Sequence, residues 1–465
     1  MTTVPKRELY DPAYDSMPTV GDYLARESGT PGLAFERGEA YEETKSISKD
    51  CFISKEWFDL EAEHVWKKVW QFACRENEIP SVGDYYEYEI VGQSVIIVRE
   101  TDSSIRAFHN VCIHRGTRLV EGCGTAQRFV CSFHGWQYGL DGKVDFLPAR
   151  WDFPQLEGND LRLREVRAET WNGMVFINMD NEAESLSDYL GPTIQRHFSE
   201  FDMAERWQGA RVARVMHCNW KVLLAAFMEV YHINRTHPQL SAYVGDVNAQ
   251  YDAWGNTGRM INPMAVPSPL LRDPPDEQGI VDSILGDNIA DLFEVNEQKV
   301  ASVSEGATAR EVIAEFMRRT HGARFKRDYS SSSISEMIDA YQYYVFPNVQ
   351  PWAGSMFPEL YVTRPHPSDP EKSVFEVRLL FPVPPGEARP KDVQLHMLEP
   401  DEPWANAKEL GELGPVIDQD VNNLKKIQLG LHSDGITDVV LSKYQEGNIR
   451  RMHRKIEHLI AAGAR

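Results

Sequence analysis

Two short segments that contain cysteine and histidine constrain this chain more than any other feature of its sequence. The first is Cys112-Ile-His114 and the second is Cys131-Ser-Phe-His134, with sixteen residues between them. Glycine and proline recur around both, and the flanking segments Tyr86–Ile90 and Ser94–Val98 are typical of short strands, which predicts a small all-β module. Two thiolates and two imidazoles on neighbouring turns can hold a two-iron cluster, with the thiolates on one iron and the imidazoles on the other.

A structural zinc site is the alternative for these segments, because it uses the same ligand types. Zinc sites usually combine a Cys-x2–4-Cys pair with a His-x3–5-His pair, whereas each segment here supplies one residue of each kind. The chain has six cysteines in 465 residues, which is more typical of metal ligands or buried thiols than of a disulfide scaffold. Cys123 lies between the segments and is expected to be an ordinary thiol in a glycine-rich turn.

A second candidate metal site follows the apolar segment Trp220–Arg235, which is expected to be a buried helix. Glu229 and His232 lie within it, and His237 comes just after it. On an ideal helix the two histidines would be about 140° apart, but Pro238 disfavours helical geometry at His237, which can therefore turn back. Two imidazoles and a carboxylate form the facial triad of mononuclear Fe(II) oxygenases. The alternative is a pair of hydrogen-bonded core histidines.

The carboxylate is expected from a helix predicted at about 415–431, where Asp418 and Asp420 are the candidates. An apolar stripe on this helix consists of Val416, Ile417, Leu424, Ile427 and Leu431. Asp420 falls in the centre of the stripe, while Asp418 lies about 160° away on the expected solvent face. Because a buried acid requires a cation, Asp420 is the preferred ligand.

The composition of the chain narrows the classes of molecule that it can bind. The formal net charge of -21 disfavours nucleic acid and anionic membranes, which would repel the chain. No apolar run approaches the ~20 residues of a membrane span, and the first residues lack the pattern of a signal peptide. A cytoplasmic protein is therefore expected.

The residues at both sites resemble a known family. Similarity to the N-terminal domain of Rieske-type non-haem iron oxygenases, the ring-hydroxylating oxygenase α subunits, is carried by Phe108-His-Asn-Val-Cys112-Ile-His114-Arg-Gly116 and Cys131-Ser-Phe-His134-Gly135-Trp136-Gln-Tyr138-Gly-Leu-Asp141-Gly142. The segment Val416–Gly430 resembles the family's acidic-ligand segment. Respiratory Rieske proteins carry extra cysteines where this chain has Thr117 and Phe133, so the likeness is to the low-potential oxygenase kind.

The resemblance implies the cofactors and the residues that bind them. A Rieske-type [2Fe-2S] cluster would be held by Cys112, His114, Cys131 and His134, and a mononuclear Fe(II) by His232, His237 and Asp420. Glu229 would act as a catalytic residue that bridges His134 of a neighbouring subunit to His232, because a metal-bound histidine needs an acceptor for its other N–H. The working unit would then be a homotrimer, with a small β subunit as a further possibility.

The implied fold class is α+β, with a small all-β Rieske [2Fe-2S] domain inserted near the N-terminus of a helix-grip-like α+β catalytic domain. The expected domains are residues 1–65, an N-terminal extension and helix packing on the catalytic domain; 66–170, the Rieske domain; and 171–465, the mononuclear iron catalytic domain. Further helices are expected at about 309–319 and 437–462, and strands at Tyr341–Phe346, Leu360–Arg364 and Phe375–Phe381.

The implied activity is that of a terminal oxygenase. With O2 and electrons from NAD(P)H, it would hydroxylate, cis-dihydroxylate or demethylate a hydrophobic, preferably aromatic, small molecule, as in aromatic hydrocarbon catabolism. The chain lacks a Gly-x-Gly-x-x-Gly signature, so a separate ferredoxin or reductase would deliver the electrons. Candidate pocket residues are Leu223, Phe227, Leu240, Tyr243, Tyr343, Val345 and Phe346. An electron-transfer protein and a zinc-stabilised scaffold remain the alternatives.

Overall fold

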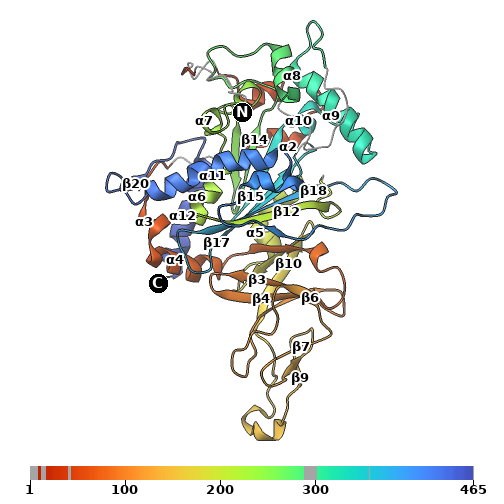
Figure 1. Cartoon of the computed structure of the whole chain (residues 1–465), viewed down its shortest axis with the longest axis vertical. Coiled ribbons are helices and arrows are strands. Elements are labelled where there is room, and N and C mark those ends of the chain that lie inside the picture. The colour runs from red at the N-terminus through yellow and green to blue at the C-terminus, as the bar shows by residue number, and fades with distance from the viewer. Residues whose placement is uncertain are drawn as a thin grey trace. The chain divides into compact units, whose positions relative to one another are not determined.

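A computed structural model describes residues 9–11, 17–39, 43–199, 201–286, 301–355 and 357–463. The chain divides into two compact units, coloured by residue number in Figure 1. The small unit comprises Lys55–Tyr189, Pro365–Asp369 and Ile456–Arg465. The large unit comprises Met1–Ser54, Leu190–Arg364 and Pro370–Lys455. The domain boundaries expected from the sequence, at about 65 and 170, stay predictions.

The small unit is built on β-strands, as expected. Strands β3 (Asp84–Ile90) and β4 (Gln93–Arg99) pair antiparallel through a two-residue loop. Both loop residues, Val91 and Gly92, have positive φ angles of 42° and 74°, as in the type I′ turn whose twist suits a hairpin. This hairpin lies within a seven-stranded sheet of order β2-β11-β10-β5-β4-β3-β6. Its other strands are β2 (Gln71–Arg75), β5 (Ile105–His109), β6 (Cys123–Thr125), β10 (Glu165–Trp171) and β11 (Met174–Asn178).

A second, three-stranded sheet of the small unit carries Cys131–His134 between its first two strands, whereas Cys112–His114 follows β5 (Ile105–His109) of the larger sheet. The strands of the three-stranded sheet are β7 (Phe129–Val130), β8 (Gln137–Tyr138) and β9 (Val144–Phe146). A hydrophobic cluster joins this sheet to the larger one and includes Phe108, Phe129, Trp136 and Tyr138. The segments therefore project from a packed core.

The large unit contains an eight-stranded sheet of order β13-β14-β15-β16-β17-β18-β12-β19. The expected strands are present as β15 (Ala340–Val345), β17 (Glu359–Pro365) and β18 (Ser373–Phe381). Sequence analysis missed the others, which are β12 (Trp207–Met216), β13 (Gln250–Trp254), β14 (Thr257–Asn262), β16 (Val349–Ala353) and β19 (His396–Met397). The first four of these are buried through much of their length and carry polar residues, so they show no clean alternation, while β19 is an exposed pair of residues too short for a pattern.

Helices accompany this sheet. Helix α9 (Ala309–Phe325) is longer than expected, and α11 (Leu413–Gly430) matches its predicted range. The last helix, α12, begins at Gly447 and not at 437, because Asp438–Val439 pairs as strand β20 with Ile47–Ser48. An α+β fold is therefore confirmed, and the β-sheets of the small unit all lie between residues 71 and 178, in the N-terminal half.

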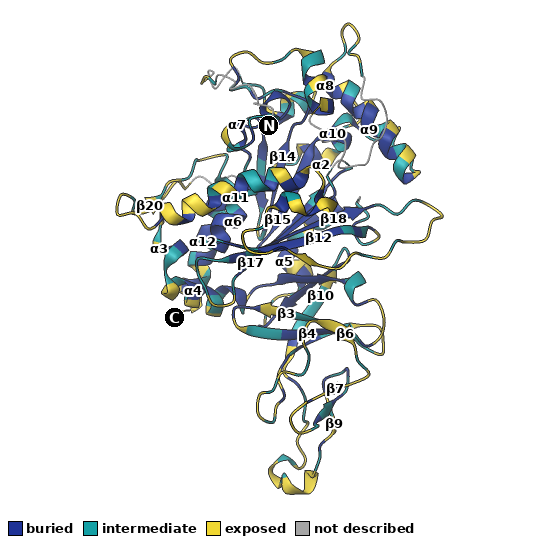
Figure 2. Cartoon of the chain, in the orientation of Figure 1, coloured by how far each residue is buried: buried dark blue, intermediate teal, exposed yellow. Residues whose placement is uncertain are grey.

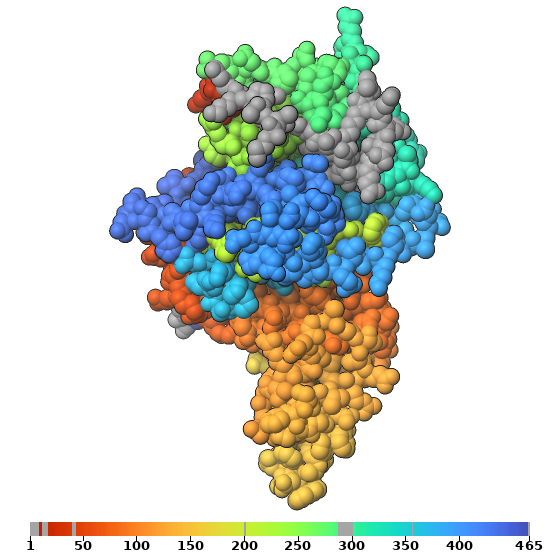
Figure 3. Space-filling model, in the orientation of Figure 1, coloured from red at the N-terminus to blue at the C-terminus, as the bar shows by residue number. Residues whose placement is uncertain are grey.

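Burial follows the layers of each unit (Figure 2). Apart from the exposed edge strand β19, the strands of the eight-stranded sheet are mostly buried, whereas α11 is buried on one face and exposed on the other. In the space-filling view, residues from the last quarter of the chain cover this sheet, and β12 emerges between them only in small areas (Figure 3). Among the described residues, no helix combines the length and the hydropathy needed to cross a bilayer.

Two glycines of the small unit provide a matched stability test. Gly142 and Gly158 have positive φ angles of 80° and 78°. A Cβ atom at Gly142 would lie 2.5 Å from the Phe108 ring, whereas a Cβ at Gly158 meets nothing within 4 Å. We expect Gly158→Ala to cost about 1 kcal/mol for the left-handed backbone alone, and Gly142→Ala to cost at least about 1 kcal/mol more through overpacking. Urea unfolding of both variants measures the difference, and equal losses would contradict this packing.

Candidate metal centres and active site

The two segments of the small unit fold into turns of the same design. In each, the N–H of a glycine four residues after the cysteine donates to the cysteine carbonyl: Gly116 to Cys112 and Gly135 to Cys131, both at 2.9 Å. Both glycines have positive φ, 82° and 74°, a conformation that other residues adopt only with strain. The shared design brings the two pairs of side chains together.

The two cysteines are buried and hydrogen-bonded. The Tyr138 hydroxyl lies 3.1 Å from the Cys112 sulfur. Burial opposes ionisation of Cys131, but the backbone N–H groups of Phe133 and His134 donate to its sulfur and lower its pKa overall. A sulfur stabilised as a thiolate is the form that binds metals.

The two histidines of these segments lie beside each other on the accessible side. Their Nδ1 atoms, of His114 and His134, are 3.1 Å apart, and the His114 ring stacks on Trp136 with centroids 5.1 Å apart. The donor set therefore has two buried sulfurs and two accessible nitrogens, which fits a cluster bound by thiolates at one end and imidazoles at the other. Cys123 lies elsewhere, exposed on strand β6 (Cys123–Thr125).

The apolar segment of the large unit is not one continuous helix, and that expectation was wrong. Helix α6 ends at Ala226, and α7 (Ile233–Thr236) forms a separate single turn. Distant side chains satisfy the backbone groups that the break releases. Gln350 of β16 donates to the Phe227 carbonyl at 2.7 Å, and the Val230 N–H donates to the Tyr251 hydroxyl at 3.2 Å.

His232 and His237 flank the short helix α7. His232 is its N-cap residue, and His237, which precedes Pro238, has left helical geometry with φ -126° and ψ 61°. As the sequence indicated, the backbone before proline turns His237 back. The two rings lie with centroids 5.3 Å apart.

Asp420 of α11 completes a three-residue cluster with these histidines. Its Oδ1 lies 2.9 Å from His237 Nε2 and 3.4 Å from His232 Nε2. One donor atom from each residue falls within 4.8 Å of the others. Two nitrogens and one carboxylate oxygen on one side of a prospective ion fit a facial triad that leaves positions open.

Further acceptors orient both imidazoles. Glu229 accepts from His232 twice, at the ring Nδ1 (2.8 Å) and at the backbone N–H (3.1 Å). Gln419 Oε1 lies 2.6 Å from His237 Nδ1. With both Nδ1 atoms so engaged, each Nε2 is the nitrogen left to bind an ion together with Asp420. Sequence analysis missed Gln419, because nothing in its neighbourhood distinguishes it from other polar helix residues.

The electrostatics around His232 favour positive charge. Burial alone would lower the pKa of His232, but the Glu229 and Asp420 carboxylates outweigh it and raise the pKa. The site is therefore built to hold a cation between buried acids, which is what a bound divalent ion requires.

Asp418 was expected on the solvent face, but its side chain instead binds backbone groups of a neighbouring segment. It is half-buried, and its carboxylate accepts from the backbone N–H groups of Trp404 (2.9 Å) and Ala405 (3.1 Å). The structure thus brings Asp420, and not Asp418, to the histidines. One stripe residue was also misplaced: Ile427 is 49% exposed.

A cavity of about 370 Å³ opens onto the cluster of His232, His237 and Asp420. Of the seven candidate pocket residues, Phe227, Leu240 and Tyr243 line it, whereas Leu223, Tyr343, Val345 and Phe346 do not. On β15 the cavity is lined by Ala340 and Gln342, so the alternation of this strand is opposite in phase to the one assumed. The expected tyrosine instead faces His197, with Tyr343 Oη 2.9 Å from its Nδ1.

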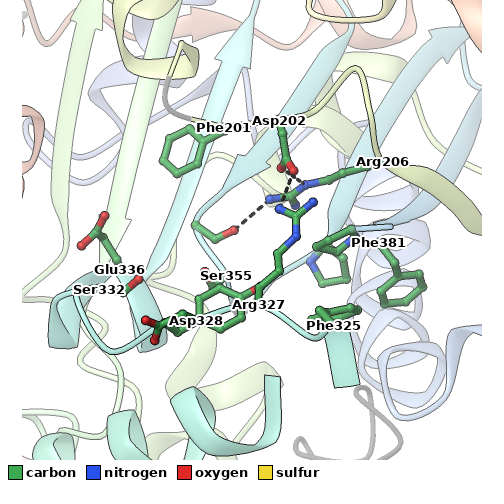
Figure 4. A pocket seen from close by; sticks show the side chains of 14 residues that line it. Phe201, Asp202, Arg206, Phe325, Arg327, Asp328, Ser332, Glu336, Ser355 and Phe381 are labelled. Carbon is green, nitrogen blue, oxygen red and sulfur yellow. Dashed lines mark hydrogen bonds and ion pairs between the residues drawn. The ribbon is translucent and has the colours of Figure 1, made fainter. Parts of the chain in front are cut away.

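A second cavity in the large unit, of about 260 Å³, offers no comparable chemistry (Figure 4). Figure 4 shows the guanidinium groups of Arg206 and Arg327 converging on Asp202, which accepts from them at 3.4 and 2.6 Å. The single Asp202 carboxylate is shared by the two guanidinium groups, and the metal-ligand cluster found among the described residues lies in the other cavity.

Comparison with known families decides the class of protein. Residues 69–157 match the model of the Rieske [2Fe-2S] domain. Residues 203–462, more than half of the chain, match the model of the ring hydroxylating alpha subunit (catalytic domain). The chain belongs to this family of Rieske non-haem iron oxygenases.

Curated relatives of this Rieske oxygenase differ in their named substrates. It is 32% identical over 203 residues to the carnitine monooxygenase oxygenase subunit of Escherichia coli (strain K12), covering 43% of this chain and 54% of that one. It is 35% identical over 198 residues to the large oxygenase component of the 2,4-dinitrotoluene dioxygenase system of Burkholderia sp. (strain RASC), covering 40% and 43%. The chain spans about half the length of the curated relatives it matches.

Solved structures show the same fold. A quaternary ammonium Rieske monooxygenase in complex with L-carnitine has a TM-score of 0.62 at 19% identity, over 89% of this chain and 95% of that chain. Naphthalene 1,2-dioxygenase with indole bound has a TM-score of 0.56 at 19% identity, over 91% and 98%. At these identities the likeness concerns the fold alone.

One buried acid in the cavity wall was not singled out from the sequence. Glu359 of β17 is 2% exposed, and burial raises its pKa to about 8. Its Oε2 has no hydrogen-bond partner among the described residues. A neutral carboxyl group is therefore favoured there at neutral pH as long as no ligand pairs with it.

This pKa predicts how stability depends on pH. The folded chain holds a proton on Glu359 that the unfolded chain releases above its usual pKa near 4.5. Because of Glu359, the free energy of unfolding therefore falls as pH rises from 4.5 toward about 8, by at most about 1.4 kcal/mol per pH unit. We expect Glu359→Gln to reduce the loss of unfolding free energy across this range, as measured by urea titrations at several pH values. A variant with an unchanged pH profile would show that Glu359 ionises normally.

Proposed function

We propose that this chain is the terminal component of an oxygenase system that uses O2 and electrons from NAD(P)H to hydroxylate, cis-dihydroxylate or demethylate a small organic molecule. The observation that carries the proposal is the cluster of His232, His237 and Asp420 at the wall of a cavity large enough for such a molecule. Electron transfer alone would not require these three donors to converge on a cavity.

The residues assigned to each metal group fit its chemistry. Cys112 and Cys131 would hold one iron of a Rieske [2Fe-2S] cluster, and His114 and His134 the other, because the sulfurs are buried and the imidazoles accessible. The mononuclear Fe(II) would be held by a separate group, namely His232, His237 and Asp420. When bound, this iron supplies the activation of O2 that organic side chains cannot provide.

The remaining roles belong to the protein. Glu229 and Gln419 hold the Nδ1 protons of the two ligand histidines and so fix their ring orientation. Apolar cavity residues such as Phe227, Leu240 and Met260 exclude water and receive the hydrophobic body of the substrate, aromatic or otherwise. The named substrates of the relatives include both aromatic and quaternary ammonium compounds, so they leave the substrate class open.

We further propose that electrons reach the mononuclear site across a subunit interface in a homotrimer, with or without a small β subunit, after delivery by a ferredoxin or reductase. His134 is exposed beside the apolar, exposed Ile113 and Phe133, which suits a face covered by another subunit. Glu229, already bonded to His232, would accept from that histidine. One solved relative is described as revealing inter-subunit electron transfer.

The first test compares two aspartates of α11. Asp420→Asn should abolish mononuclear iron binding and O2-dependent turnover while the visible spectrum of the two-iron cluster stays unchanged, because the carboxylate charge that balances the ion is lost. Asp418→Asn is the control, since its carboxylate accepts from the backbone of Trp404 and Ala405 and does not meet the two histidines. Iron analysis and visible spectroscopy check both. Full turnover by Asp420→Asn, or a colourless zinc-containing wild type, would refute the oxygenase proposal.

The second test concerns Glu229. Glu229→Gln should retain both kinds of iron but slow oxidation of the reduced cluster by O2 and substrate by about 10- to 100-fold, the usual range for losing an acceptor behind a metal ligand. Glu412→Gln, which changes an exposed acid lining the same cavity, should oxidise at the wild-type rate. Stopped-flow absorbance follows the cluster. Equal rates in both variants would remove Glu229 from the electron path.

A further inference from the structure

The charges lining the cavity are all of one kind among its described residues. Four acids line it, namely Glu229, Glu359, Glu412 and Asp420, and no lysine or arginine does. Glu229 and Asp420 are engaged with the histidines, and Glu412 is exposed to solvent. Glu359 is the buried acid that remains. Because no lysine or arginine of the described lining competes for Glu359, a cation placed beside it would meet a carboxyl group that can ionise and pair with it.

Glu359 lies in a row of side chains that crosses one face of the sheet. The register pairs Met260 of β14 with Gln342 of β15, and Gln342 with Trp352 of β16. Pro351 pairs with Leu360, so the next position of this antiparallel ladder sets Trp352 beside Glu359. All four residues of the row line the cavity.

Aromatic rings surround this end of the row. The Trp352 ring packs against Phe357 and Tyr361 with centroid distances of 5.3 and 5.6 Å, and Tyr361 packs against Phe227 at 5.3 Å. Burial and the nearby carboxylates of Glu359 and Asp420 raise the pKa of Tyr361, so this ring lies within electrostatic reach of both acids. Faces of aromatic rings attract cations, most strongly where water is excluded.

We propose that Glu359, together with the rings of Trp352 and Tyr361, binds a positively charged ammonium group of the substrate. This inference rests on the proposed function, because it names the substrate class of the same cavity. The unpartnered Glu359 Oε2 would gain a counter-charge, and the cation would exchange water for the carboxylate and the ring faces. The side-chain nitrogens of Trp352 and Gln342 also lack partners among the described residues, and they can donate to an uncharged oxygen on the same substrate.

A neutral ligand is the competing occupant. A protonated Glu359 could donate to a carbonyl group, and apolar rings accept any hydrophobic body. The two occupants differ in whether a positive charge on the ligand strengthens binding at constant shape. An isosteric pair of probes therefore separates them.

The experiment measures binding of benzyltrimethylammonium, neopentylbenzene and phenylacetate to the iron-loaded full chain by calorimetry or equilibrium dialysis. We expect the cation to bind at least about tenfold more tightly than its uncharged isostere, and the anion to bind least. Glu359→Gln should remove most of this preference and Trp352→Leu part of it, whereas Asp418→Asn, which lies outside the cavity lining, should leave it unchanged. The comparison of probes on the wild type needs no variant to fold.

Each outcome bears on a different statement. Equal binding of the cation and the uncharged isostere, or a preference retained by Glu359→Gln, would overturn the ammonium site. If the cation binds preferentially but no variant or substrate ever shows O2 consumption, the ammonium site stands and the oxygenase proposal fails. If uncharged substrates are turned over and a positive charge does not strengthen binding, the oxygenase proposal stands and the ammonium site fails.

Discussion

The large unit depends on one buried carboxylate. Asp420 is 5% exposed and lies on the face of α11 that packs toward the sheet. An unpaired charge at such a position would cost several kcal/mol, which is avoided here because two imidazoles meet it. Helix α11, the turn after α6 and the short helix α7 must therefore converge at this point. The cavity, the orientation of the histidines and the positive-charge preference of the site follow from that convergence.

The parts of this arrangement that could be predicted from the sequence are those encoded locally. Both cysteine- and histidine-containing turns show their ligands within three or four residues, and Pro238 reveals the geometry of His237 directly before it. Asp420 was separable from Asp418 because helical periodicity places them on different faces. The strands β3 and β4 followed from two short segments, Tyr86–Ile90 and Ser94–Val98, whose residues are typical of strands.

The parts that escaped prediction depend on residues far apart in the chain. The break between α6 and α7 is possible because Gln350 and Tyr251, on strands more than a hundred and about twenty residues away, satisfy the released backbone groups. Without knowledge of those partners, an apolar segment of this length is correctly expected to be helical. Which side chains of β15 face the cavity could not be predicted either. Both faces of this strand are buried, so no polar face marks the side that points to solvent.

The same break has a consequence for how this cavity can diversify. Gln350 and Tyr251 hold the turn that carries the ligand histidines. The strand of Gln350 also borders the cavity through Trp352, so altering Gln350 would disturb iron binding and substrate fit at once. Ala340, Gln342 and Trp352 face the cavity without holding that turn. Evolution, or an engineer, can therefore retune the accepted molecule at these three positions while the catalytic machinery is inherited intact.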